Sequence, residues 1–451
     1  LTGQNAAATW QLNGAGGFQG VYQSGGQSLT FSGLDSLVGG GNSDLFNVTS
    51  NHGASLNGGA GPDTFDIDVA MPTSNLTGGL GTDILQGDVI NAVGLTNLDA
   101  NGADGTEDSI NGGVNSFTDI ETITGNGGSF TSVANATGTF RLDGTPTYAI
   151  GARALRLSVV NLSGFTTLQG NTGVDTYLLT VASAFELLGG GGDDVFDIDA
   201  ALTGQVDGQG GTNDVLMGST IDAVILTNVD GSGADGTETS ISGNFTNIET
   251  ITGNAGTLTG VNAASLWDLD GSAQYSTNVG QFLNFGGFAN LVGLGAVDTF
   301  NVNGPGPSAF NLAGGGSADI FNLNATLTGS IAADAGNDVI NMNNGGSITG
   351  NLDGGNTAHL NYGANAGPVT VTLTNIGTID GFRGTATGIG GTFDNITTLT
   401  GSLGADTLNG DDQISVWNLG AVQTYVSQLQ TLTFSGIETL TGNTNADTFN
   451  V

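Results

Sequence analysis

Aspartates that recur at a fixed distance from a glycine are the residues most able to do chemistry in this chain. In each copy an aliphatic residue, any residue and Gly are followed after four residues by Asp, any residue and a large apolar residue. A carboxylate next to the carbonyls of a Gly-rich turn suits a hard cation such as Ca²⁺. The alternative is that each Asp caps its own turn by accepting backbone N–H groups. The clean copies place this residue at Asp44, Asp63, Asp83, Asp175, Asp194, Asp298, Asp319, Asp406 and Asp447, and degenerate copies place Asp214, Asp338 and His359 near the same position.

A second acidic pattern occurs twice. Its alternating oxygen-bearing residues end in Glu and are similar to a hard-cation loop, although the third acidic position is one residue late for an EF-hand. A later part of the chain has Arg383 at the matching place, where a guanidinium can stand in for a cation. A plain solvated loop is the alternative. The candidate ligands are Asp99, Asn101, Asp104 and Glu107 in the first copy and Asp230, Asp235 and Glu238 in the second.

Residues typical of catalysis are sparse. The two histidines, His52 and His359, are isolated, and a surface or ladder role is favoured for them. The chain has no Cys, phosphate-binding loop or nucleophile elbow. The Asp-x-Asp pairs at 66–68 and 197–199 would lie on one face of a strand, most simply in solvent. The sequence therefore predicts that the protein is not an enzyme.

Composition narrows the class of protein further. Of 451 residues, 81 are Gly. The chain has 41 acidic and four basic residues, which gives a formal net charge of −37. This charge disfavours binding to nucleic acid or to anionic membranes, and no apolar run is long enough to predict membrane insertion. Because 37% of the residues are hydrophobic, the chain can still bury a core.

Two periods organise the chain. An aromatic residue followed by x-Leu marks Trp10, Phe140, Trp267 and Trp417, and core packing is the simplest role for these rings. They divide the chain into segments 1–139, 140–266 and 267–416 and the start of a fourth, 417–451. Within each segment, the leading aliphatic residues recur every 19 to 21 residues. The third segment is longer by about one such repeat, which a stack of repeats tolerates because each contacts only its neighbours.

The short period predicts an all-β fold, a parallel β-solenoid with coils of about 20 residues. Val, Ile, Thr and Phe favour strands, while Gly and Asn suit tight corners. Layered Leu, Ile, Val and Phe would fill the interior, and Asn and Thr ladders would line the corners. With about 4.8 Å between stacked strands, the whole chain would form an elongated rod of roughly 100 Å.

Two motifs carry a resemblance to known families. The string Gly-Gly-x-Gly-x-Asp-x-apolar at 58–65, 78–85 and 189–196 resembles the nonapeptide of RTX proteins. That resemblance implies Ca²⁺ between adjacent turns, although here the copies come once per repeat and not in tandem every nine residues. The Phe-x-x-Ile-Glu-Thr-Ile-Thr-Gly strings at Phe117 and Phe245 are similar to repeat regions of large bacterial adhesins, RTX-like or filamentous-haemagglutinin-like.

The resemblance implies a non-enzymatic, extracellular structural or adhesive rod at the bacterial cell surface, the stalk of a large adhesin with Ca²⁺ as a stiffening cofactor. Its partners would be further repeats of the same chain or host and cell-surface glycans and proteins. Both ends fall within repeats, since Leu1–Ala7 is repeated at Leu258–Ala264. A self-assembling filament, matrix or surface-layer subunit that stacks end to end is therefore the alternative, and a β-helical polysaccharide-active enzyme is a third hypothesis.

Overall fold

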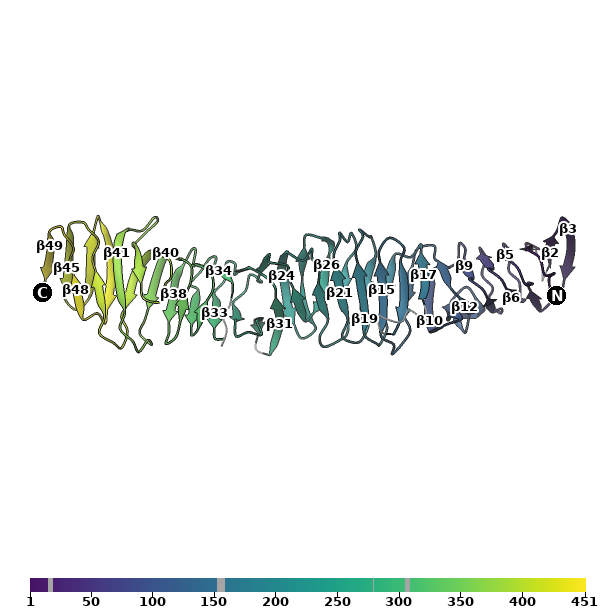
Figure 1. The fold of residues 1–451 in the computed structure, drawn as a ribbon, viewed down its shortest axis with the longest axis horizontal. Helices are drawn as coiled ribbons and strands as arrows, with labels where there is room; N and C mark the ends of the chain where they lie inside the picture. The colour runs from purple at the N-terminus through teal and green to yellow at the C-terminus, as the bar shows by residue number, and fades with distance from the viewer. Residues whose placement is uncertain (15–18, 152–158, 279, 305–308) are drawn as a thin grey trace. The chain divides into compact units, whose positions relative to one another are not determined.

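The computed structural model describes residues 1–14, 19–151, 159–278, 280–304 and 309–451 (Figure 1). In these residues the chain consists of β-strands and turns, with one 3-10 turn at Asn111–Gly113 and no α-helix. The predicted all-β class is therefore confirmed. No helix in this part of the chain is long and apolar enough to cross a membrane. Arg153 and Arg156, two of the four basic residues, lie outside the described residues.

The chain folds into two compact units. Unit 1 comprises Leu1–Thr220 and Ser240–Ile248, and unit 2 comprises Ile221–Thr239 and Glu249–Val451. The boundary between the units does not coincide with a boundary between sequence repeats, so the four sequence segments stay a prediction.

Unit 1 contains two rows of hydrogen-bonded strands, named row A and row B. In order of pairing, row A is β3 (Gln27–Ser32), β2 (Gln19–Ser24), β1 (Ala8–Leu12), β5 (Asp44–Val48), β7 (Thr64–Ile67), β9 (Ile84–Gln86), β13 (Thr122–Thr124), β17 (Val159–Ser163), β16 (Thr147–Ile150), β15 (Gly138–Leu142), β19 (Asp175–Leu179), β21 (Val195–Ile198) and β23 (Val215–Met217). Row B is β4 (Ser36–Val38), β6 (Ser55–Ala60), β8 (Leu76–Leu80), β12 (Phe117–Ile120), β11 (Gly102–Glu107), β10 (Ala92–Asp99), β14 (Ser129–Thr131), β18 (Thr167–Gln169), β20 (Glu186–Leu188), β22 (Val206–Asp207) and β26 (Ile241–Ile248).

Unit 2 has the same two rows. Its row A is β27 (Thr250–Thr252), β31 (Gln281–Gly286), β30 (Gln274–Asn278), β29 (Ser265–Asp268), β33 (Asp298–Val302), β35 (Ile320–Leu323), β38 (Asn337–Met342), the end of β40 (Leu352–Asn361), the end of β43 (Phe393–Thr400), β47 (Gln430–Ser435), β46 (Gln423–Ser427), β45 (Ser415–Leu419) and β49 (Asp447–Asn450). Its row B is β25 (Gly233–Glu238), β24 (Ala223–Asp230), β28 (Thr257–Thr259), β32 (Asn290–Val292), β34 (Asn311–Ala313), β37 (Ile331–Ala332), the starts of β40 and β43, β42 (Phe382–Ala386), β41 (Thr370–Ile376), β44 (Thr407–Asn409) and β48 (Thr439–Thr441). A separate parallel pair joins β36 (Thr326–Leu327) and β39 (Ser347–Ile348).

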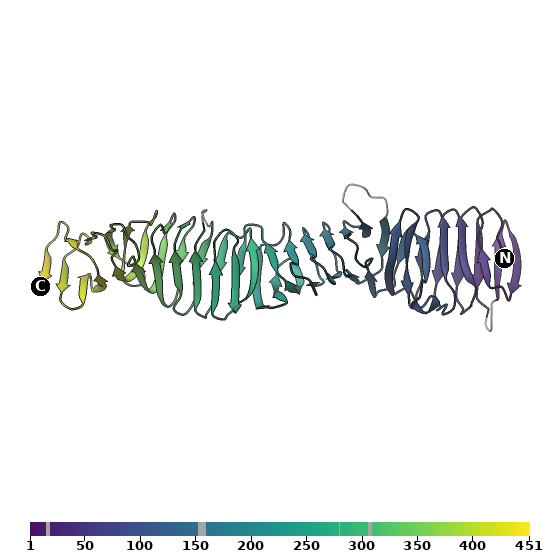
Figure 2. The ribbon, with the colours of Figure 1, turned by 90° about the horizontal axis from the view of Figure 1, so that it is seen from below.

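Most of these pairings are parallel and join equivalent residues of successive repeats. Phe46 of β5 pairs with Phe65 of β7, and Leu37 of β4 pairs with Leu56 of β6. From β4 to β9 the chain alternates between row B and row A, so that neighbours in a row are one repeat apart (Figure 1, Figure 2). The predicted parallel, in-register pairing is confirmed.

Antiparallel hairpins interrupt both rows, and the expectation of parallel strands alone was wrong there. In row A, β1, β2 and β3 form a three-stranded antiparallel group, and β15–β17, β29–β31 and β45–β47 repeat it. Ser24 of β2 pairs with Gln27 of β3, and Gly25 and Gly26 between them have φ of 56° and 77°. Two successive positive φ values are those of a type I′ turn, which reverses the chain in two residues.

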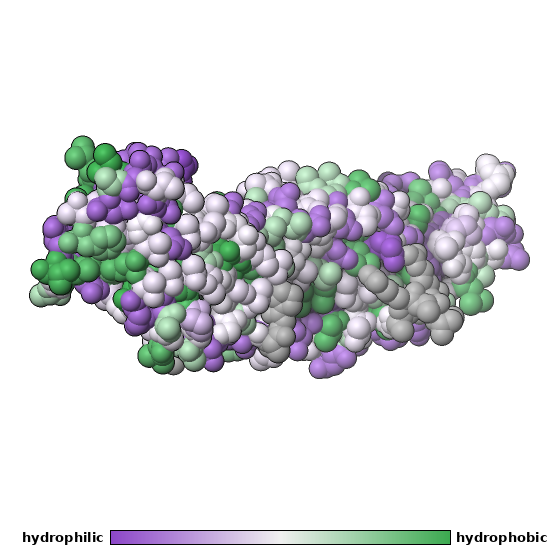
Figure 3. Space-filling view, turned by 60° about the vertical axis from the view of Figure 1, so that its left-hand side comes forward, coloured by the Kyte–Doolittle hydropathy of each residue, from purple (hydrophilic) through white to green (hydrophobic). Residues whose placement is uncertain are grey.

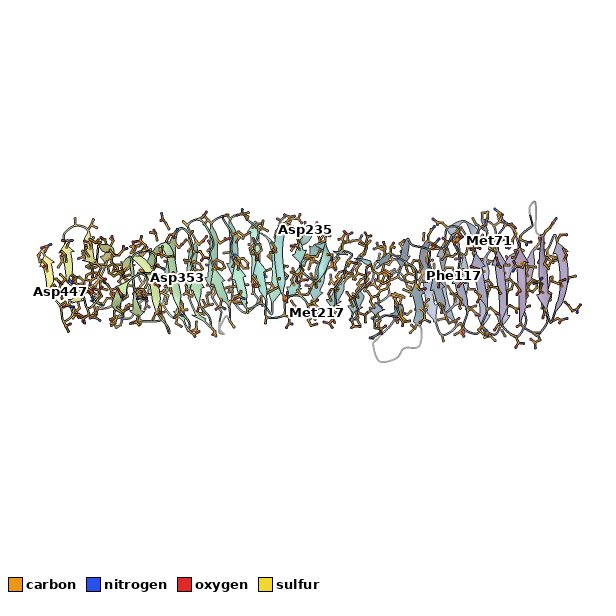
Figure 4. The ribbon with its side chains drawn as sticks, turned by 90° about the horizontal axis from the view of Figure 1, so that it is seen from above. Met71, Phe117, Met217, Asp235, Asp353 and Asp447 are labelled. Atoms are coloured by element: carbon orange, nitrogen blue, oxygen red, sulfur yellow. The ribbon has the colours of Figure 1, made fainter. Side chains whose placement is uncertain are left out.

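Aromatic rings fill the space between the rows. In row A, Trp10 stacks on Phe46 with ring centroids 5.4 Å apart, and Phe46 stacks on Phe65 at 5.0 Å. Phe130 of row B meets Phe140 of row A edge-on at 6.1 Å, and Phe117 of row B is 1% exposed (Figure 4). The predicted packing role of the four aromatic residues that mark the segments is confirmed, because all four are fully buried.

Polar ladders cover the outer side of the strands. Side-chain amides of Asn301, Asn322, Asn341 and Asn361 form a chain in which each Nδ2 donates to the Oδ1 of the preceding member at 2.7–2.8 Å. This ladder runs along strands and not at corners. The predicted corner ladder is confirmed just past the strand ends, where Asn324 Nδ2 donates to Asn303 at 2.6 Å and Asn343 Nδ2 to Asn324 at 2.8 Å. The exposed face visible in Figure 3 is mostly of intermediate hydropathy, with small hydrophilic and hydrophobic patches.

Candidate functional site

The motif aspartates of row A point into the interior and lie above one another. Each stands two residues before a buried core residue, as Asp44 stands before Phe46, so strand alternation puts both side chains on the inner face. A small residue stands in register with the first member: Ala8 with Asp44, Gly138 with Asp175 and Ser265 with Asp298. We call the three columns the aspartate ladders. Their members are Asp44, Asp63 and Asp83; Asp175, Asp194 and Asp214; and Asp298, Asp319 and Asp338, each at most 2% exposed.

Each rung of a ladder is a hydrogen bond from backbone to carboxylate. The N–H of Asp44 donates to Oδ1 of Asp63 at 2.7 Å, and the N–H of Asp63 donates to Oδ1 of Asp83 at 2.8 Å. The same bonds measure 2.6 and 2.7 Å in the second ladder and 2.8 and 2.8 Å in the third. A carboxylate therefore caps the backbone of the preceding repeat, which goes beyond the capping of its own turn that the sequence suggested.

The first member of a ladder differs from later members in the hydrogen bonding of its other carboxylate oxygen, Oδ2. Oδ2 of Asp44 accepts the N–H of Gly40 at 2.7 Å, and the first members Asp175 and Asp298 make the equivalent bond. At the place of Gly40, the repeat of Asp63 has Gly59 with φ of 99°, which turns the N–H elsewhere. Oδ2 is buried and accepts no hydrogen bond from the described residues in Asp63, Asp83, Asp194, Asp319 and Asp338.

The first glycine of each motif leaves room for this carboxylate. A Cβ on Gly58 would lie 2.3 Å from Oδ2 of Asp63 and 2.6 Å from the carbonyl oxygen of Gly78. The matching distances at Gly189 are 2.5 Å to Asp194 and 2.6 Å to Gly208. No side chain fits at these distances. The Gly-x₄-Asp spacing is therefore a packing requirement of the ladder.

Burial raises the pKa of the ladder carboxyls, because the charged form loses its water. It raises the pKa of Asp63 to about 7, of Asp194 to about 8 and of Asp319 to about 7, with neighbouring carboxyls adding to the shift. The pKa values of Asp83, Asp175 and Asp338 rise to about 6 for the same first cause.

At two motif aspartates, Asp83 and Asp406, the carboxylate that accepts the backbone N–H belongs to a glutamate. This role of glutamate was not predicted from the sequence. The N–H of Asp83 donates to Oε2 of Glu121 at 2.5 Å, and burial raises the pKa of Glu121 to about 7. In row B, Asp406 accepts the N–H of Val369 at 2.7 Å and donates its own N–H to Glu438 at 2.8 Å. Both glutamates belong to Ile-Glu-Thr-Ile/Leu-Thr-Gly strings, whose recurrence was the available signal.

The remaining motif positions differ from the ladders. Asp447 accepts a hydrogen bond from Ser415 Oγ and is half-buried. His359 does not take an Asp position as expected, because Ala358 is in register with Asp338 and His359 faces outward to Thr400 Oγ1 at 2.8 Å. One residue of slip reverses the face of a strand residue.

His52 is buried, contrary to a surface role. Its Nδ1 accepts the N–H of Ala54 at 3.1 Å, and burial lowers its pKa to about 4.

The second acidic pattern forms hairpins, β10–β11 in unit 1 and β24–β25 in unit 2. Asn97 Nδ2 donates to Asp99 and Asp104, at 3.4 and 3.2 Å, while Asn101 lies in the turn and donates its N–H to Asp99. Glu107 instead faces inward, 1% exposed, and accepts the N–H of Ser109.

The unit 2 hairpin repeats this geometry. Asn228 Nδ2 lies 2.9 Å from Asp230 and 3.3 Å from Asp235, and Glu238 is 3% exposed. In both hairpins the two aspartates come together and the glutamate does not join them. Arg383 is exposed on β42, in register with Asn375.

No group of three or more His, Cys, Asp or Glu side chains that could hold a metal ion is found in the described part of the chain. Backbone carbonyls and side-chain amides are also ligands for Ca²⁺, so Ca²⁺ binding stays a prediction. A comparison of the chain with protein-family models and with curated proteins found no match. The repeats and their ladders are therefore the basis on which a function can be inferred.

Proposed function

We propose that the chain is a β-solenoid that serves as a non-enzymatic structural or adhesive rod, the stalk of a large bacterial surface adhesin. The observation that carries this proposal is the pairing of equivalent residues one repeat apart, which occurs in row A and row B of both units. Rows A and B would then be two sides of each coil. Such a stack extends in one dimension as repeats are added, because each repeat contacts only its neighbours, and this suits a stalk.

The side-chain ladders support this proposal. Stacked rings, Asn amides and capped carboxylates each link one repeat to the next, for example Phe300 to Phe321 at 5.0 Å and Asn322 to Asn301 at 2.8 Å. These contacts hold successive repeats in one register, which favours a stiff element over a flexible tether. The location would be extracellular, where the acidic surface meets abundant cations.

Electron microscopy of the purified chain tests the solenoid. A rod of roughly 100 Å is expected from about 20 residues per coil and about 4.8 Å per strand. A compact particle with no long dimension would contradict the rod.

Antibodies raised against the chain test the location. They should label intact cells of the source organism, and deletion of the gene should lower attachment to surfaces without slowing growth. Labelling only after permeabilisation would contradict the surface assignment.

The second candidate is a filament or surface-layer subunit that stacks end to end. The in-register pairing of equivalent residues one repeat apart favours it, because equivalent repeats can pair between copies as they do within one chain. The mass of the denatured cellular protein distinguishes the two. A chain near 44.7 kDa supports the subunit, and a chain several times longer supports the stalk.

A further inference from the structure

Three ladders share a local geometry that the structural role of the chain does not require. In the middle member of each, Oδ1 accepts a backbone N–H, while Oδ2 is buried without a donor among the described residues. The middle members are Asp63, Asp194 and Asp319. A carboxylate oxygen left in this way is costly when charged, since neither water nor an N–H offsets the lost hydration.

Each of these carboxylate oxygens and a backbone carbonyl oxygen of the next repeat lie close to the Cβ position of the same motif glycine. The point where a Cβ of Gly58 would stand is 2.3 Å from Oδ2 of Asp63 and 2.6 Å from the carbonyl oxygen of Gly78. At Gly314 the distances are 2.5 Å to Asp319 and 2.7 Å to the carbonyl oxygen of Ala333. A carbonyl oxygen is an acceptor only, so it cannot supply the hydrogen bond that Oδ2 lacks.

We propose that the aspartate ladders bind protons: the middle carboxyl of each ladder is a neutral acid in the folded chain, and its proton is lost, with the stability it provides, when the pH rises. The proton sits on Oδ2, the oxygen that has no donor among the described residues, and Oδ1 keeps its backbone N–H. Folding thus takes up one proton per middle carboxyl from solvent. This proposal goes beyond the role of the chain as a rod and holds for any location of the protein.

The charged neighbours favour a proton on every middle carboxyl. Asp63 is acted on by Asp44 and Asp83. For Asp194 and Asp319 the described charged neighbours are also acids and include no basic group: Asp175, Asp193 and Asp214 around Asp194, with the ring of Tyr177 nearby, and Asp298, Asp334 and Asp338 around Asp319.

The sign of the pH dependence follows from the raised pKa values. A group with folded pKa above its unfolded value contributes stability that is complete below the unfolded pKa and is lost as the pH rises through the folded pKa. For Asp63, Asp194 and Asp319 that window runs from 3.8 to between about 7 and about 8. The chain should therefore be most stable in mild acid and lose stability on the way to mild alkali.

Thermal unfolding of the whole chain, followed by circular dichroism from about pH 4 to about pH 9, tests the proposal. The midpoint should fall by at least about 4 °C across that range in EDTA. The variant D63N/D194N/D319N, in which an amide N–H can replace the acid O–H, should lose a large part of the fall, and the other ladder carboxyls and Glu121 account for the remainder. The control D143N/D199N/D270N removes three exposed charges and should keep it.

Two results would overturn the proposal. One is a midpoint that is flat or rises with pH. The other is a midpoint at about pH 8 that Ca²⁺ raises in the parent chain but not in the ladder variant, since the ladders would then hold a cation. If the triple variant does not fold, potentiometric titration of the parent decides: the folded chain should bind at least about three more protons at pH 6 than the chain unfolded in urea, and equal binding would refute the idea.

Discussion

Asp193 and Asp194 are adjacent in the chain, yet the pKa values of their carboxyls are shifted in opposite directions. Asp193 lies on the outer side of a turn and Asp194 on the inner side. Asp193 is exposed, and its Oδ1 accepts the N–H groups of Thr212 and Asn213 at 3.0 and 3.1 Å, which lowers its pKa. Asp194 is fully buried and its Oδ1 also accepts a backbone N–H, from Asp175 at 2.6 Å, but its pKa rises to about 8. The hydrogen bonds are alike, so the loss of water decides the direction.

The same contrast recurs elsewhere on the outer side. Oδ1 of Asp199 accepts the N–H of Ser219 at 2.7 Å, and its pKa is lowered. On the β24–β25 hairpin, Asp230 accepts the N–H of Ser232 at 2.8 Å with the same direction of shift in its pKa. One residue type therefore has two roles in this chain. Aspartates on both sides link repeats, since Asp193 and Asp199 accept N–H groups 19 and 20 residues along the chain, but only the outer ones supply surface charge.

Phe321→Ala should have the largest effect on stability, because it removes a core side chain from the inner side of row A, next to the ladder that contains Asp319. Phe321 is fully buried and stacks on Phe300 at an interplanar angle of 4°. Removing a buried aromatic ring costs about 3–5 kcal/mol. The urea midpoint of unfolding should fall accordingly.

Ile320→Ala is the matched control on the same strand, since Ile320 faces outward and is only half-buried. It should cost clearly less than Phe321→Ala. Equal losses would show that inner and outer sides of row A do not differ in packing.

Gly314→Ala comes next and tests whether glycine is required by the ladder. A Cβ there would lie 2.5 Å from Oδ2 of Asp319 and 2.7 Å from the carbonyl oxygen of Ala333. Overpacking of this kind costs about 1–3 kcal/mol, and thermal unfolding should show the loss.

Gly286→Ala is the control, because a Cβ at Gly286 meets no atom within 4 Å. It should leave the midpoint nearly unchanged. If Gly314→Ala is equally silent, the Gly-x₄-Asp spacing needs another explanation.

The repeat spacing made row pairing predictable, because residues one repeat apart, such as Phe46 and Phe65, are chemically alike and pair in register. The antiparallel groups escaped prediction, although Gly25-Gly26 was a two-residue turn signal. They break the rule that each strand pairs one repeat away, which the periodicity had suggested for the whole chain.

The ladder residues were predicted, but their direction was not. The motif reads Asp-x-apolar, and strand alternation places Asp63 on the same face as the buried Phe65. That signal was present, but the two roles predicted for these aspartates, turn capping and Ca²⁺ binding, do not specify which face of the strand the side chain takes. The φ of 99° at Gly59, which leaves Oδ2 of Asp63 without a donor among the described residues, cannot be derived from the spacing.

Asp194→Asn should have a smaller effect whose sign depends on pH. In acid the parent carboxyl is neutral, so the amide should change stability little. Above the folded pKa of about 8, the parent carries a buried charge that the variant lacks. The variant should then be the more stable chain, by about 1–3 kcal/mol. Urea unfolding on either side of that pKa measures the difference, and a variant that is less stable in alkali would contradict the buried-acid description.

Asp193→Asn should have the smallest effect and the opposite pH dependence. A folded pKa below the unfolded value gives stability that is present above the unfolded pKa of 3.8 and lost as the pH falls through the folded pKa. Because Asp193 is exposed and screened, its charge contributes about 0.5 kcal/mol or less at neutral pH. The variant should be slightly less stable than the parent near neutrality and equal to it in acid, where both side chains are uncharged. The same urea series that measures Asp194→Asn checks this, and parallel pH profiles for the two variants would mean that the outer and inner carboxyls share one environment.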